Sequence, residues 1–528
     1  MAKKVRKISP DKNSKLPDFD VQIAKYFYFV IPVLTVIYYI SSKYSLGYYQ
    51  DDELGHFLNM VQFWSDPSVI VGNWPKFGYK IFMVIPALLG YDAVLIANSL
   101  ISACAVYLTY YVIKVYNIKY AFLGAILLAF QPLFFDLSFR SYAEIFTAVL
   151  LLLLIIFYKK DKHILAGLTC GYIYLVRQEA VLIAIFLAVI FFMRKQYIAI
   201  ICIAVFPLIF NILGYFKTGD IMFIITEMQS LGAMDFGGAE RGFFHYFKIY
   251  IFIIGPVCLA LFLLGFFGFD PGKLTEYIKR FDILYVIFAV TFLVQAMLMV
   301  QGVNPGTWRY MLHISPIAAI FATIGFNKLA DPGFRNRFYV LTGFLLLATL
   351  IFSSKVPTGL ELTDESNFTM FVVLLIFTGF VLMFKNDSAK AYLNKLSILF
   401  IILSVGSTLY AFEPRQLSPQ NISVQQVADY SASSEFNDKK IYYTHTNLVF
   451  YSLLEGGELD KFVPLDMKSL SEAKQGDIII WDTHYGYRPE YKKDVQLEVL
   501  QDSSKYKFIN QFVSSDRRFA AYVFEKIN

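Results

Sequence analysis

The sequence is poor in cysteine and in charged residues. It has 4 cysteines in 528 residues, and only 17% of its residues are Asp, Glu, Lys or Arg. All four cysteines lie in apolar stretches, so we expect no structural disulfide and no cysteine metal site. Because 57% of the residues are hydrophobic and 18% are aromatic, the chain is too apolar for a soluble protein of this length. The composition indicates a polytopic membrane protein.

Thirteen apolar segments are candidates to cross the hydrocarbon layer as helices. Eight are long uncharged runs, and five are shorter or interrupted. The long runs are residues 26–42, 93–113, 197–216, 249–269, 283–301, 338–354, 368–384 and 396–412, and the shorter ones are 120–135, 142–158, 164–176, 180–193 and 310–327.

Lys and Arg orient these segments, because basic residues mark cytoplasmic loops. The ambiguous stretch is 164–193, where Arg177 and Glu179 interrupt an apolar run that is either one long helix or two short spans. Two spans place the later basic loops inside, and one span places them outside. We therefore predict two spans, with the amino terminus inside and the carboxy terminus outside. The net charge of +6 then reflects topology and anionic lipid, and nucleic acid is not an expected partner.

The composition changes to that of a soluble protein after Phe412. Three β-like runs follow, with helix-compatible stretches between them, which predicts a small α/β domain outside the membrane. The runs are residues 440–451, 477–483 and 519–525. The predicted divisions of the chain are a basic amino terminus (1–25), a transmembrane domain (26–412) with a first outer loop (43–92), and a soluble domain (413–528).

Three consecutive carboxylates, Asp51, Asp52 and Glu53, follow the first span, with His56 close behind. Carboxylates beside hydrocarbon lose solvation, which is tolerated only with partners, water access or a function. We therefore predict a catalytic carboxylate at the membrane surface. One alternative is the cap and first turn of an interfacial helix. The triplet with His56 would also suit a divalent metal, although its spacing specifies none and His56 also fits an ordinary interfacial histidine.

The predicted topology gathers arginines on the same outer face as these carboxylates. A guanidinium group binds phosphate through paired, charge-assisted hydrogen bonds. Arginines at span ends are also explained as boundary residues whose charged ends reach the interface. The four candidate phosphate ligands are Arg140, Arg177, Arg241 and Arg309.

A family resemblance rests on these motifs. The acidic triplet in the first outer loop, the glycine-containing fifth span that ends at Arg177, and the sequence Trp308-Arg309-Tyr310-Met311 followed by Pro316 resemble the GT-C superfamily of polyprenyl-phosphate-sugar-dependent glycosyltransferases. That superfamily includes protein O-mannosyltransferases, lipid A aminoarabinose transferases and mannosyltransferases of lipid-linked glycans. The resemblance implies that a first-loop aspartate is the catalytic base. The family's Asp-Glu pair matches Asp52 and Glu53, with Asp51 as a second candidate.

Transfer of a sugar from a lipid phosphate needs few catalytic side chains. A sugar on a lipid phosphate has a good leaving group and needs one base, whereas a glycosidase also needs an acid. We predict an inverting glycosyltransferase that moves a mannose-like hexose from a polyprenyl-phosphate donor to a lipid, glycan or protein acceptor. Its site would face the periplasm of a bacterial inner membrane, or the equivalent side of the endoplasmic reticulum membrane in a eukaryote. A transporter or flippase of lipid-linked saccharides is the alternative, and a non-catalytic scaffold presenting the soluble domain is a third.

Overall fold

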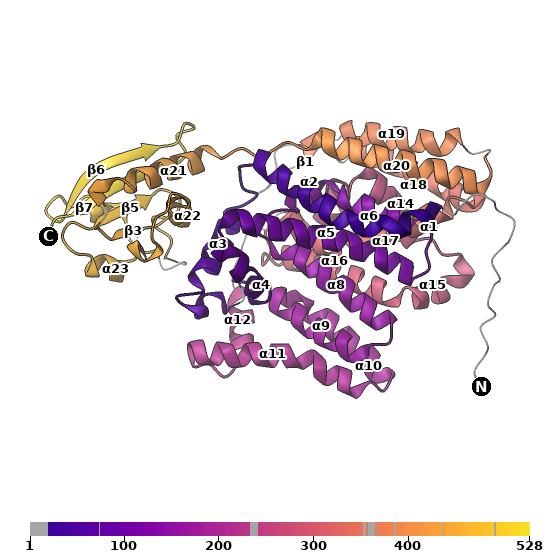
Figure 1. Ribbon diagram of the computed structural model, residues 1–528, viewed down its shortest axis with the longest axis horizontal. Helices are drawn as coiled ribbons and strands as arrows, with labels where there is room; N and C mark the ends of the chain where they lie inside the picture. The colour runs from indigo at the N-terminus through magenta and orange to yellow at the C-terminus, as the bar shows by residue number, and fades with distance from the viewer. Residues whose placement is uncertain are drawn as a thin grey trace.

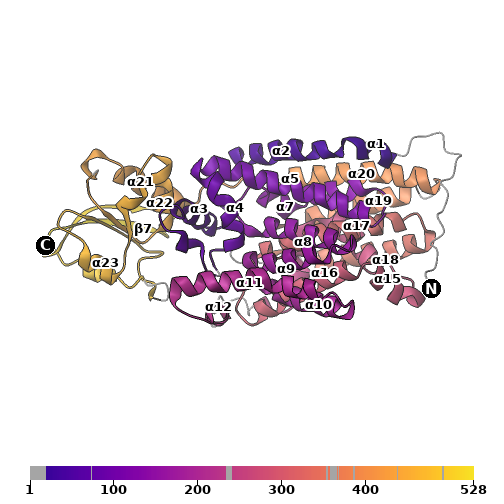
Figure 2. The same ribbon diagram turned by 60° about the horizontal axis from the view of Figure 1, so that its bottom comes forward.

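The computed structural model describes residues 19–72, 74–232, 241–351, 355–356, 365–366, 368–384, 387–436, 438–489 and 493–528. A large helical part occupies most of the molecule, and a small sheet with its own helices lies at one end of the long axis (Figure 1). The long helices run roughly along that axis, with α3 and α4 between them and the sheet (Figure 2). Most of the predicted basic amino terminus, residues 1–18, lies outside the described residues.

The helical part contains twenty α-helices within the described ranges. They are α1 (Phe19–Tyr26), α2 (Val30–Tyr44), α3 (Asp52–Gln62), α4 (Phe77–Leu88), α5 (Tyr91–Val115), α6 (Ala121–Ala129), α7 (Pro132–Leu137), α8 (Ala143–Lys159), α9 (His163–Val176), α10 (Val181–Met193), α11 (Tyr197–Thr218), α12 (Phe223–Gly232), α13 (His245–Ile254), α14 (Pro256–Phe266), α15 (Leu274–Arg280), α16 (Asp282–Val300), α17 (Ser315–Lys328), α18 (Pro332–Ile351), α19 (Phe368–Met383) and α20 (Ala389–Ala411), with the 3-10 helix η6 (Trp308–Ile314) before α17. Two short strands, β1 (Lys355–Val356) and β2 (Glu365–Ser366), form an antiparallel pair.

Among the described residues, six helices are long and apolar enough to cross a membrane, and four more apolar helices are shorter. The six are Ile23–Tyr44, α5, α11, α16, Trp308–Lys328 and α20. This pattern confirms the predicted helical membrane protein, whereas the count of thirteen spans stays a prediction. The apolar stretch 164–193 forms two helices, α9 and α10, separated at Arg177 as predicted. Residues 352–354 of the predicted span 338–354 lie outside the described residues.

The predicted span 249–269 is wrong as one straight helix. Helices α13 and α14 meet at an angle of 117°. Between them Gly255 has a φ of +80°, and Pro256 starts α14 because it has no N–H to continue α13. A side chain at Gly255 would lie 3.3 Å from the ring of Pro132. Pro132 starts α7, so the helix predicted over 120–135 is also interrupted. The two helix breaks therefore pack against each other.

The carboxy-terminal sheet has five strands in the order β4-β3-β5-β7-β6. β3 is parallel to β4 and β5, and β7 is antiparallel to β5 and β6. The elements are α21 (Pro419–Ser431), β3 (Ile441–Tyr443), α22 (Thr446–Leu454), β4 (Phe462–Pro464), α23 (Met467–Glu472), β5 (Ile478–Asp482), α24 (Leu497–Leu500), β6 (Tyr506–Val513) and β7 (Ala520–Lys526).

Two of the three predicted strands are confirmed, as β5 and β7. The third, 440–451, is a strand only at its start. His445 then caps a helix, accepting the backbone N–H of Asn447 at 3.3 Å, and the apolar residues that follow pack on the sheet as α22. The burial of this apolar helix face overrides the local β-propensity of its residues.

The carboxy-terminal part is held against the helical part by an apolar contact and by its linker. Phe450 of α22 is fully buried, with its ring centroid 5.0 Å from that of Tyr91 and 5.7 Å from that of Phe57. In the linker, Arg415 forms an ion pair with Asp136 at 2.6 Å. Gly47 donates its N–H to the Arg415 carbonyl at 2.8 Å. A side chain at Gly47 would collide with the backbone of Gln416, so this close approach requires glycine.

Phe450→Ala should loosen the carboxy-terminal part from α3. Removing a fully buried phenylalanine ring costs about 3–5 kcal/mol, and the loss falls on this junction. We expect a lower melting temperature of the purified protein and faster limited proteolysis in the linker. The matched control is Phe508→Ala, because Phe508 is 52% exposed. Equal cleavage rates in the two variants would show that Phe450 does not hold the junction.

Candidate active site

The acidic triplet lies at the start of α3, but capping does not explain it. Asp51 occupies the cap position, and its side chain accepts no cap hydrogen bond. The three carboxylates instead contact three different parts of the molecule. Asp51 reaches the carboxy-terminal part, Asp52 reaches η6, and Glu53 reaches the loop after α7.

Asp52 is held by Arg309, which lies 257 residues further along the chain. Nη2 of Arg309 donates to Oδ2 of Asp52 at 2.9 Å, and its Nη1 donates to Oε1 of Glu144 at 3.1 Å. The Arg309 side chain is 8% exposed and that of Asp52 is 38% exposed. A half-exposed carboxylate is thus fixed by a buried cation, with its Oδ1 atom free of hydrogen bonds within the described residues.

Glu144 joins two of the predicted arginines. The same oxygen, Oε1, accepts from Arg309 and, at 2.9 Å, from Nη1 of Arg177. The Tyr310 ring contacts both guanidinium groups, with centroid distances of 5.0 Å to Arg177 and 5.1 Å to Arg309. Arg177 also pairs with Glu179 at 2.5 Å. The structure therefore brings Asp52, Arg309 and Arg177 together through a glutamate at the start of α8.

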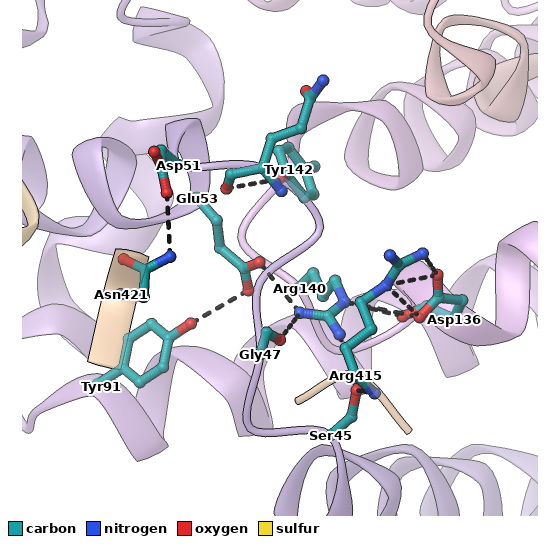
Figure 3. Close-up of polar contacts among 11 residues, drawn as sticks. Ser45, Gly47, Asp51, Glu53, Tyr91, Asp136, Arg140, Tyr142, Arg415 and Asn421 are labelled. Atoms are coloured by element: carbon teal, nitrogen blue, oxygen red, sulfur yellow. Dashed lines mark hydrogen bonds and ion pairs between the residues drawn. The ribbon is translucent and has the colours of Figure 1, made fainter. Parts of the chain in front are cut away.

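Arg140 holds the acidic loop (Figure 3). Its Nη1 donates to the Gly47 carbonyl at 2.8 Å and to Glu53 at 3.2 Å, and its Nη2 donates to Ser45 at 2.8 Å. Glu53 also accepts from the Tyr91 hydroxyl at 3.1 Å. Arg140 and Glu53 are both buried. These contacts give Arg140 a place in shaping the loop, rather than leaving it free for a phosphate.

Arg241 and His56 do not join the ion pairs among the described residues. Arg241 packs on Gly306, three residues before Arg309. His56 is buried, with its ring 5.2 Å from that of Trp74. Burial, together with the positive charges of Lys80 and Arg309, holds the pKa of His56 well below its ordinary value. His56 is therefore neutral at pH 7.

Two lysines outside the predicted set of site residues, Lys76 and Lys80, lie close to these charged groups. Lys80 is fully buried and donates to Asn59 at 2.5 Å. Lys76 is partly buried and forms no hydrogen bond or ion pair with the described residues. Burial, followed by the charge of Arg177, lowers the pKa of Lys76 to about 8. A signal was present in the sequence, because lysines four residues apart at the start of an apolar segment are unusual beside a membrane.

The acidic triplet is not arranged as a metal site. Within the described ranges, no three His, Cys, Asp or Glu side chains are grouped so that they could hold a metal ion. The three carboxylates point to separate partners, so they do not converge on one point. A divalent metal at Asp51, Asp52 and Glu53 stays a prediction.

Solved structures share this architecture. No protein-family model and no curated protein matches the sequence. The structure of ArnT from Cupriavidus metallidurans bound to undecaprenyl phosphate is 12% identical, with a TM-score of 0.55 over 95% of this chain and 98% of that chain. The same protein in the apo state is 11% identical, with a TM-score of 0.58 and the same coverage. The chain has the fold of ArnT.

This likeness shows the fold alone. At 11–12% identity the ArnT fold assigns no residue roles, which rest on the contacts described above. The predicted gathering of carboxylates and arginines at one end of the helices is what this fold produces, because the ends of α3, α8, α9 and η6 meet there.

Glu144→Gln should strongly destabilise the protein. Two buried guanidinium groups would lose the carboxylate that they share, and breaking a buried ion pair costs about 3–5 kcal/mol. We expect a clear fall in melting temperature and a lower yield of folded protein. Glu413→Gln, which removes an exposed carboxylate in the linker, is the control. An unchanged melting temperature for Glu144→Gln would contradict the shared ion pair.

Proposed function

We propose that the protein is an inverting glycosyltransferase that uses a polyprenyl-phosphate sugar. The observation that carries this proposal is the half-exposed carboxylate of Asp52 on a buried guanidinium group, at the helix ends of a fold whose solved example binds undecaprenyl phosphate. The sugar is proposed to be a mannose-like hexose, and the acceptor a lipid, glycan or protein with a free hydroxyl. The site is proposed to face the periplasm, or the equivalent side of another membrane.

Asp52 acts as the base in this proposal. Its free Oδ1 takes the proton of the acceptor hydroxyl while that oxygen attacks the anomeric carbon. The bond from the anomeric carbon to the phosphate oxygen breaks, its electron pair goes to the phosphate, and the configuration inverts. Asp52 becomes neutral as the phosphate gains its second negative charge, so the summed charge of the site does not change. A group that accepts this proton contributes about 10²- to 10⁴-fold to a rate.

Lys76 and Arg309 are the cations proposed for the donor phosphate. Lys76 has no ion-pair partner within the described residues, so a phosphate would compete with no carboxylate for it. Arg309 already shares its donors among Gln50, Glu144 and Asp52. It therefore both positions the base and contributes positive charge where the leaving phosphate becomes more negative. Arg177 contributes indirectly, because it binds the same Glu144 oxygen as Arg309.

Asp52→Asn should abolish sugar transfer while the protein folds and inserts normally, and Asp51→Asn should be milder or comparable. The loss expected for a missing base is about 10²- to 10⁴-fold. Transfer of labelled hexose from a polyprenyl-phosphate donor measures it, with Asp92→Asn as a control because that side chain is 62% exposed. Near wild-type transfer in both single mutants and in the double mutant would refute the base assignment. Movement of lipid across sealed vesicles without any transfer would favour the transporter instead.

Lys76→Met should weaken donor binding and remove a pH dependence. Only the protonated amine attracts phosphate, and burial brings the pKa of Lys76 down to about 8. Donor affinity of the wild type should therefore be complete below this pH and fall as the pH rises through it. A lost charged hydrogen bond costs about 1.5–3 kcal/mol, which is roughly a tenfold to hundredfold rise in donor KM.

Lys248→Met is the control for this prediction, because Lys248 is exposed on α13. The donor KM is measured from pH 6 to pH 9 in the wild type and both variants. A Lys76→Met variant with the wild-type KM and the same alkaline decline would exclude Lys76 from the phosphate site.

A further inference from the structure

The connections of the carboxy-terminal sheet reverse direction beside β3. The chain runs from β3 through α22 to β4 on one side, and then through α23 to β5 on the other side of β3. Leu448 of α22 packs with Ile478 and Ile480 on one face of the sheet. Leu470 of α23 packs with Tyr442 and Ile479 on the opposite face. In sheets of this kind, ligands bind outside the carboxyl ends of the strands, at the point of reversal.

The residues at that point form a polar cluster, which we call the strand-end cluster: Gln420, His445, His484 and Tyr485. His445 follows β3, and His484 and Tyr485 follow β5. The side-chain amide of Gln420 hydrogen bonds with Nε2 of His445 at 2.7 Å and with Nδ1 of His484 at 3.0 Å. The rings of His484 and Tyr485 are stacked, with centroids 4.3 Å apart and planes 3° from parallel.

Buried Asp482 fixes this arrangement. One oxygen of its carboxylate accepts the backbone N–H of His484 at 2.9 Å and that of Tyr485 at 2.7 Å. Asp482 is only 1% exposed, so the turn after β5 is held by a buried carboxylate. The stacked pair is therefore presented by a rigid turn, as a binding site requires.

The strand-end cluster borders the acidic helix α3. The side-chain amide of Asn447 donates to Oδ1 of Asp51 at 2.9 Å. Asn421 donates to the same oxygen at 3.5 Å (Figure 3), and the Tyr485 hydroxyl lies 3.5 Å from Oδ2. Asp51 is therefore oriented by amide and phenol groups of the carboxy-terminal part. Its neighbour Asp52 belongs to the helical part.

We propose that the strand-end cluster binds a saccharide acceptor and that Asp51 orients its reacting hydroxyl toward Asp52. This inference rests on the proposed function. Amide and imidazole groups exchange hydrogen bonds with sugar hydroxyls, and a stacked aromatic pair offers an apolar face to a sugar ring. Burial lowers the pKa of His445 and of His484, so both rings are neutral at pH 7. The Lys493 ammonium group and the Arg488 guanidinium group lie 4.4 Å and 5.1 Å from the Tyr485 ring centroid, so the cluster is bordered by cations as well as by Asp51.

The test separates acceptor binding from donor use in the full-length protein. Purified wild type and His484→Ala are given a labelled polyprenyl-phosphate hexose, first alone and then with membranes from cells that lack the protein. We expect His484→Ala to raise the acceptor KM by about tenfold or more, since stacking and one hydrogen bond are lost. Donor hydrolysis without acceptor should fall by less than about twofold, because the donor groups are untouched.

The matched control is Tyr487→Ala, an exposed tyrosine two residues beyond the stacked pair. Tyr485→Phe is the second variant, because it keeps the ring if His484→Ala does not fold. It should raise the acceptor KM through loss of the contact with Asp51. An unchanged acceptor KM in either folded variant would overturn the proposal. Equal losses of donor hydrolysis and transfer would also overturn it, because the cluster would then serve the donor or the fold.

A binding measurement tests saccharide binding by the strand-end cluster independently of sugar transfer. Saturation-transfer NMR on the wild type with a panel of methyl hexosides should show contacts that disappear in His484→Ala. If the wild type cleaves no donor, the proposed function fails, and this measurement still decides whether the cluster binds saccharides. Absence of any contact in the wild type would overturn the inference.

Discussion

The shared ion pair of Glu144 with Arg177 and Arg309 is the interaction on which the site depends. All three groups are buried, and a buried charge without a partner is very costly. One carboxylate oxygen therefore holds together the start of α8, the end of α9 and η6. Arg309 in turn fixes Asp52. The position of the candidate base thus follows from a glutamate that it does not touch.

The acidic helix α3 is where the parts of the molecule meet. The three adjacent carboxylates at its start contact η6, the carboxy-terminal part and the loop after α7. Phe450 and the linker around Arg415 fasten the carboxy-terminal part beside them. Asp51 contacts the carboxy-terminal part, and Asp52 contacts η6 of the helical part. Because the two residues are neighbours in sequence, the position of the carboxy-terminal part restricts where the Asp52 carboxylate lies. In the proposed function, this arrangement would let the carboxy-terminal part act beside the candidate base Asp52.

The breaks in the apolar helices place polar groups against other parts of the protein. A helix that stops leaves backbone groups that need partners, and in a membrane protein such ends must face protein or water. The break at Gly255 packs against Pro132, and the break at Arg177 places its guanidinium group on Glu144. Polar groups thus lie at helix ends, where the apolar spans do not have to bury them against lipid.

The sequence by itself determined the helical membrane class of the protein and the neighbourhood of the candidate site. Long apolar runs, a soluble tail and three carboxylates after the first span are local patterns, and local patterns report burial and exposure. The two strands β5 and β7, the separation of α9 from α10, and the gathering of Asp52, Arg177 and Arg309 followed from them. Only the tertiary structure decided the partners: Arg140 for the loop, Arg309 for Asp52, and the carboxy-terminal amides for Asp51. It also leaves Lys76 without an ion pair among the described residues. Those choices depend on side chains as far apart as Asp52 and Arg309, 257 residues along the chain, and no periodicity in the sequence encodes a distance between them.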